Sequence, residues 1–143
     1  MRLLALAGGI ALVSTVALAA ASSSSKAVSA SFAFGLRGGN VVPFTATISR
    51  TGQVTVTQGG KRSRRPRLSV AAVRGLFTLA RAERFFALPK EIDCSGVLPD
   101  VAAEFVRVRT AGRTRTVTER GSCSRRFEEL YSVLAAVVRP PTP

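Results

Sequence analysis

Apolar residues alternate with small or polar residues in three segments of the first half of the chain. Residues 32–37 have the sequence Phe-Ala-Phe-Gly-Leu-Arg, and the same period of two recurs in residues 44–49 and 54–57. A period of two is typical of a half-buried β-strand. Thr51-Gly52 separates the second and third segments, which predicts a β-hairpin with its threonines on the open face.

Two other segments carry apolar residues at helical spacing. In residues 73–80 they recur every third or fourth position, after Ser69, which suits a helix N-cap. In residues 127–138 apolar side chains follow one face of a second amphipathic helix. Ser122 or Ser124 is the expected N-cap of that helix.

A second pair of strands is expected at residues 101–110 and 114–118, joined at Ala111-Gly112. Two-residue and three-residue turns both fit this connection, so its register stays open. Residues 59–67 begin with two glycines and are then mostly cationic, which predicts a basic loop. Residues 89–100 hold two prolines and a glycine and predict another loop.

The expected order of elements is therefore β-β-β-α-β-β-α. Two hairpins favour an antiparallel sheet of about five strands, with both helices packed on one face, in the α+β class. One domain is expected over residues 32–139. It is preceded by a flexible Ser/Ala-rich linker at 22–31 and followed by a Pro-rich tail at 140–143.

The first 21 residues have the layout of a secretory signal peptide. Met1-Arg2 precedes an uncharged run from Leu3 to Ala21, and A-x-A patterns allow cleavage after Ala19 or Ala21. The run of 19 residues is also long enough to span a bilayer. We therefore expect a secreted or otherwise extracytoplasmic protein, with an uncleaved membrane anchor as the alternative.

Cys94 and Cys123 are the only cysteines of the chain, and export would place them outside the reducing cytoplasm. An oxidising compartment favours joining them in a disulfide. Two thiols without a histidine would need carboxylates to complete a metal site, so no bound metal is expected.

The composition is strongly basic, with 21 Lys+Arg against 8 Asp+Glu and a formal net charge of +13. Such a charge favours anionic partners and carries no information about the fold. We expect anionic cell-envelope polymers or a lipid surface, and no specific nucleic acid, because aromatic stacking platforms are missing from the pattern. The candidate anion-binding residues fall on the basic loop and the second hairpin: Lys61, Arg62, Arg64, Arg65, Arg67, Arg107, Arg109, Arg113 and Arg115.

The chain offers little for catalysis. It contains no histidine, which excludes Ser-His-Asp and Cys-His nucleophilic sites, and no cofactor-binding motif is present. Asp93, Asp100 and Glu104 are the nearest approach to an acidic cluster, and paired carboxylates can hydrolyse glycosides. A small carboxylate-dependent hydrolase is therefore the remote alternative, and no catalytic residue is assigned.

Three local motifs together resemble small exported bacterial domains of unknown function. They are the hairpin Phe44–Val54, the Phe85-Phe86-Ala87-Leu88-Pro89 sequence after the first helix, and Pro99-Asp100 before the next strand. The resemblance covers residues 31–138. It implies the α+β fold but no activity and no functional residue.

These features predict a secreted, non-enzymatic binding protein of the cell envelope that holds anionic surfaces through arginine-rich patches. Arg64, Arg65 and Arg67 are the first residues to test. A different class is also open, a small exported inhibitor that presents the 59–67 loop or the 89–100 loop to a partner enzyme.

Overall fold

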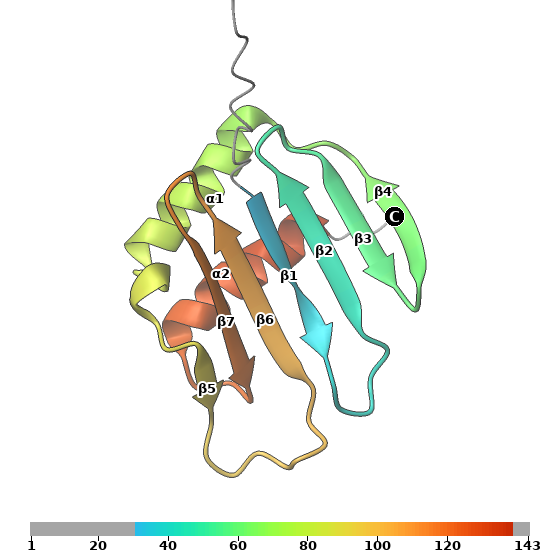
Figure 1. Ribbon diagram of the computed structural model, residues 1–143, viewed down its shortest axis with the longest axis vertical. Helices are drawn as coiled ribbons and strands as arrows, with labels where there is room; N and C mark the ends of the chain where they lie inside the picture. The colour runs from blue at the N-terminus through green and yellow to red at the C-terminus, as the bar shows by residue number, and fades with distance from the viewer. Residues whose placement is uncertain (1–30, 139–143) are drawn as a thin grey trace, which may run out of the picture.

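The computed structural model describes residues 31–138 and shows two helices packed on one face of a seven-stranded mixed sheet (Figure 1). The α+β class and the helices on one face are confirmed, whereas the sheet has more than the expected five strands. The predicted signal peptide, the linker up to residue 30 and the C-terminal tail lie outside the described residues. The strands are β1 Ser31–Arg37, β2 Phe44–Ser49, β3 Val54–Gln58, β4 Lys61–Arg65, β5 Glu91–Asp93, β6 Ala103–Arg109 and β7 Thr114–Arg120; the helices are α1 Val70–Ala82, η1 Phe85–Ala87 and α2 Arg125–Val138.

The strand order across the sheet is β4-β3-β2-β1-β6-β7-β5. The strands from β1 to β4 form a meander, and α1 then carries the chain back across the sheet to the opposite edge. As a result β1 lies between β2 and β6, and β5 pairs with β7 in parallel, whereas every other pair is antiparallel. The sheet is therefore mixed rather than purely antiparallel.

The prediction of a basic loop at residues 59–67 is wrong. Gly59 and Gly60 take positive φ angles of 53° and 77°, which is the backbone of a tight two-residue hairpin turn. Lys61–Arg65 then pairs with β3 along its whole length. Residues 89–100 are likewise not a loop throughout, because Glu91–Asp93 forms the short edge strand β5.

The core lies between the sheet and the helices. Phe32 and Phe34 of β1 are about 1% exposed, and their cross-strand neighbours on β6 are Val108 and Val106. From α2, Phe127, Leu130 and Leu134 are buried against this layer, as the helical spacing predicts.

Both helices begin at serine caps. The Ser69 hydroxyl accepts a hydrogen bond from the Ala72 N–H at 3.0 Å, and the Ser124 hydroxyl accepts one from Phe127 at 3.4 Å. Ser69 and Ser124 therefore satisfy donors that the first turn leaves unpaired. Within residues 31–138 neither helix has the length and hydrophobicity needed to cross a bilayer.

The register of the second hairpin, open from the sequence, is fixed by one hydrogen bond. The Thr110 N–H donates to the Arg113 carbonyl at 2.8 Å, which leaves Ala111-Gly112 as a two-residue turn. Arg109 then pairs with Thr114 and Arg107 with Thr116. This register decides which arginines of β6 share a face with the threonines of β7.

Candidate functional site

The face of the sheet that points away from the helices is rich in hydroxyl groups. Thr47 of β2 lies in register between Thr55 of β3 and Ala33 of β1. Because side chains alternate along a strand, the threonines of both hairpins lie together on this face: Thr45, Thr47, Thr55, Thr57, Thr114, Thr116 and Thr118. This face can therefore offer hydroxyl donors and acceptors over much of its width.

A shallow groove of about 580 Å³ crosses the open face above β1. β1 lines it with Ser31, Phe32 and Ala33, and by alternation only the small side chains of Ser31 and Ala33 point to this face, so the floor is shallow. Gly35 continues this strip of small residues, and a methyl group on Gly35 would overlap the Phe44 carbonyl oxygen. The close approach of β1 and β2 thus requires glycine at this position.

Four arginines line the groove on its two sides. Arg62 and Arg64 come from β4, and Arg107 and Arg109 come from β6. Arg64 is the register partner of Thr55, and Arg107 is the register partner of Ala33. Since β4 and β6 are four strand spacings apart, the two pairs of Cα atoms stand roughly 19 Å apart across the hydroxyl floor.

The electrostatics of the groove favour an anion. Among the described residues that line it, none is acidic. The Arg107 Nε–H donates to the Thr116 hydroxyl at 3.1 Å, which orients a guanidinium group that carries five N–H donors in all. Arginine in this arrangement suits phosphate, sulfate and carboxylate groups.

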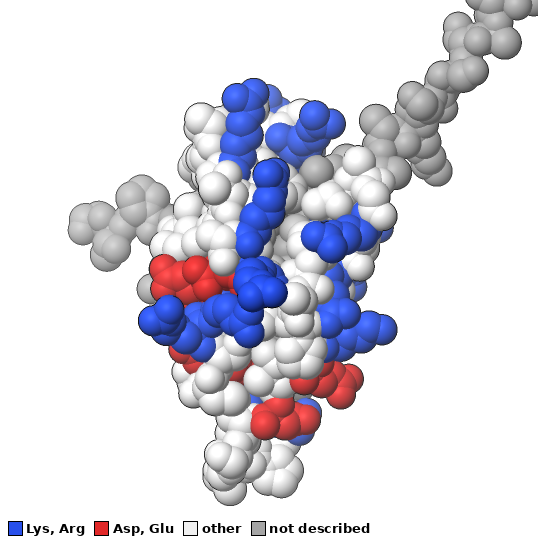
Figure 2. Space-filling view, turned by 90° about the vertical axis from the view of Figure 1, so that its left-hand side faces the viewer, with Lys and Arg blue, Asp and Glu red and all other residues white. Residues whose placement is uncertain are grey.

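The other end of the open face has mixed charge. There the Arg37 guanidinium lies 4.7 Å from the centre of the Phe105 ring and donates to the Thr118 hydroxyl at 2.5 Å. A second hollow of about 430 Å³ is lined by Glu91 and Asp93 as well as by Arg37 and Arg120. From the α1 and β5 edge, Figure 2 shows basic side chains over the upper and middle parts of the molecule and acidic ones from the middle downward.

Five of the nine predicted anion-binding residues lie outside the groove. By register, Lys61 and Arg65 are on the helix side of β4, and Arg115 is on the helix side of β7, where it donates to the Leu88 carbonyl. The Arg113 guanidinium lies 3.8 Å from the centre of the Phe86 ring. Arg67 follows β4 and does not line the groove.

The acidic residues singled out from the sequence are not brought together on one face. Asp93 pairs with Arg120 on β7, whereas Glu104 pairs with Glu119. Because Glu119 and Arg120 are consecutive residues of a strand, Asp93 and Glu104 point to opposite faces of the sheet. Asp100 accepts a hydrogen bond from the Asn40 amide at 3.3 Å and joins two loops.

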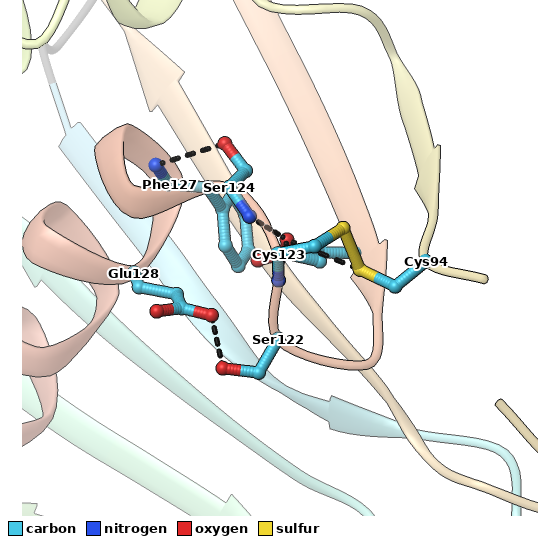
Figure 3. Close-up of a disulfide and its surroundings, with 7 residues drawn as sticks. Cys94, Ser122, Cys123, Ser124, Phe127 and Glu128 are labelled. Atoms are coloured by element: carbon cyan, nitrogen blue, oxygen red, sulfur yellow. Dashed lines mark hydrogen bonds between the residues drawn. A yellow bond between two sulfur atoms is a disulfide. The ribbon is translucent and has the colours of Figure 1, made fainter. Parts of the chain in front are cut away.

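The predicted disulfide between Cys94 and Cys123 is confirmed, with an S–S distance of 1.98 Å. It ties the residue after β5 to the segment that enters α2 (Figure 3). In that segment Ser122 donates a hydrogen bond to the Glu128 carboxylate. A disulfide is compatible with an extracytoplasmic location.

Glu119 is a buried carboxylate that sequence reasoning missed. It is 0% exposed, and its Oε1 atom accepts hydrogen bonds from the N–H groups of Cys123 and Ser124 at 3.1 and 2.7 Å. Burial raises the pKa of Glu119 above its ordinary value, against the lowering effect of those two N–H groups, and Glu128 raises it further. Glu119 shares the inward face with Val117, so the period of two along β7 could have identified it.

Glu119 also lies close to both sulfur atoms. A cluster of two thiolates and a carboxylate is a possible metal site, but both sulfurs are consumed by the disulfide. The neighbouring carboxyl of Glu104 has a raised pKa as well, mainly through burial and then through the charges of Glu119 and Glu128. We therefore assign this cluster a structural role at the start of α2.

No protein-family model matches the chain, and a comparison with curated proteins finds no match either.

Proposed function

We propose that the protein is an extracytoplasmic, non-enzymatic binding protein that holds an anionic polymer on the open face of its sheet. The observation that supports this most is the groove in which Arg62, Arg64, Arg107 and Arg109 surround a lining rich in serine and threonine, with no carboxylate among the described residues that line it. Cell-envelope polymers that carry phosphate, sulfate or carboxylate groups are the ligand class.

The geometry also explains why the ligand would be a polymer. Along one strand, alternate residues such as Arg62 and Arg64 are roughly 6.6 Å apart, and the two arginine pairs are roughly 19 Å apart. One small anion cannot reach both pairs, whereas a chain lying across the strands can. Hydroxyl groups between the pairs would hydrogen-bond the uncharged parts of such a chain.

The experiment is a titration of the oxidised protein against dextran sulfate, polyphosphate and poly-glutamate at several salt concentrations. Four contacts should give a slope of log K against log salt of about −3, because binding releases the counterions of the polymer. We expect all three polymers to bind at low salt. Absence of binding at low salt, or binding that is indifferent to salt, would contradict the proposal.

A second candidate function, a secreted inhibitor of a partner enzyme, is favoured by a different observation. Within residues 31–138, four of the five exposed large hydrophobic residues lie in two connections, Val41 and Val42 before β2 and Leu98 and Val101 before β6. Both connections lie at the lower end of the molecule in Figure 1. The Asn40–Asp100 hydrogen bond joins them, and the disulfide anchors the second one near its start.

The two functions differ in their response to salt. As an inhibitor, the protein should retain one stoichiometric protein from culture supernatant at high salt. Leu98→Asp should then abolish that retention, because Leu98 is 67% exposed and would insert its side chain into the partner. Recovery of a salt-sensitive mixture, unchanged by Leu98→Asp, would exclude inhibition through this loop.

A further inference from the structure

The helices leave part of the inner face of the sheet uncovered. A trough of about 380 Å³ lies there, between the strands β1 to β4 and the second half of α2. Its apolar lining comes from both layers: Phe34, Leu36, Phe44, Val56, Ala135 and Val138. The trough lies on the opposite side of the sheet from the arginine groove and is independent of the function proposed for that groove.

The two ends of the trough have opposite chemistry. Arg65 on β4 stands at one end and Glu104 on β6 at the other. They are four strand spacings apart, and because Arg65 lies in register with Val108 they are also offset by four residues along the strands, which separates their Cα atoms by roughly 23 Å. The trough thus has a cation at one end and a carboxyl group at the other.

The half-buried side chain of Arg65 lines the trough. Its Nε atom is buried and has no hydrogen-bond partner among the described residues. A buried unpaired donor costs free energy, and more so on a charged group. The rest of the Arg65 guanidinium is the cationic group of the trough, and a guanidinium and a carboxylate make parallel hydrogen bonds.

The acidic end of the trough determines which way round an amphiphilic ligand would lie. Glu104 faces Glu119 across the β6–β7 pair, and the charge of Glu128 also acts on it. Glu104 is the acidic residue among the described residues that line the trough, and its carboxyl group does not favour an anionic head group at that end. The aromatic floor of the trough, in which Phe34 and Phe44 meet edge to face with ring centres 6.4 Å apart, suits an apolar chain.

We propose that the trough binds a single-chain amphiphile with its carboxylate on Arg65 and its apolar chain extended over Phe34 and Phe44 toward Glu104. The two faces of β4 supply a matched control. Arg65 faces the trough, and its neighbour Arg64 faces the groove on the opposite side.

The test is calorimetric titration of the oxidised full chain with dodecanoate below its micelle-forming concentration and with dodecanol below its solubility limit. Arg65→Met should weaken dodecanoate binding by about tenfold or more, because it removes a charge-assisted hydrogen bond, and should leave dodecanol binding unchanged. Arg64→Met should leave both unchanged. Arg65→Met should also leave polyanion binding nearly unchanged, so this proposal and the proposed function can fail separately.

Three results would overturn the proposal. The first is no dodecanoate binding by the folded wild-type chain. The second is an equal loss of affinity in Arg64→Met and Arg65→Met. The third is binding only by a variant that ends at Val138, because the last five residues of the chain would then be the occupant.

Discussion

Replacing both cysteines, in the variant Cys94→Ser/Cys123→Ser, is expected to lower the free energy of unfolding by about 3–4 kcal/mol. The disulfide closes a loop with a sequence separation of 29 residues, and its removal increases the conformational entropy of the unfolded chain. The folded state is affected at the same place. β5 has only three residues and pairs with β7 alone. The disulfide at the next residue therefore holds β5 at the edge of the sheet.

Urea and thermal unfolding of the wild type and the double variant measure this effect. For a domain of this size we expect the midpoint temperature to fall by more than about 10 °C. Reductant should destabilise the wild type to the same extent and should not affect the double variant. Equal midpoints in the two proteins would show that β5 and the entry to α2 hold together without the bond.

Replacing the four groove arginines, Arg62, Arg64, Arg107 and Arg109, by serine is expected to weaken polyanion binding by about 100-fold at low salt. Each exposed ionic contact contributes about 0.2–1 kcal/mol, and four losses of about 0.7 kcal/mol each give this factor. All four side chains are exposed, so the fold should survive the change.

A charge-matched control separates the groove from the total charge. Arg74, Arg81, Arg125 and Arg126 are exposed and lie on α1 and α2, on the other side of the sheet. Their replacement by serine removes the same charge and should change the affinity only a few-fold, through the long-range field. A comparable loss in both variants would mean that net charge, and not the groove, attracts the polymer.

The sequence predicted the strands that have an apolar side and missed those that lack one. β1 and β2 bury alternate residues, and that period predicts them, whereas β6 is predicted from its apolar residues and the Ala111-Gly112 turn after it. β4 is Lys-Arg-Ser-Arg-Arg, with no apolar residue. It is a strand because the Gly59-Gly60 turn returns it onto β3, and an edge strand with cationic side chains needs no apolar face. β5 is too short for any period to be visible.

The candidate site was likewise predicted only in part from the sequence. The basic residues were found by composition, but their grouping depends on strand register. Once Lys61–Arg65 is a strand, alternation sends Arg62 and Arg64 to one face and Arg65 to the other. β4 and β6 line the same groove because β1 pairs with β2 on one side and with β6 on the other, which joins the strands of the first half of the chain to those of the second. Local patterns do not encode that long-range pairing.

Arginine footprinting by phenylglyoxal, read by mass spectrometry with and without dextran sulfate, locates the bound polymer on the molecule. We predict that the polymer protects Arg62, Arg64, Arg107 and Arg109 and leaves Arg74, Arg81, Arg125 and Arg126 as reactive as in the free protein. Protection of the helix arginines, or equal protection of all eight, would contradict a binding site on the open face of the sheet.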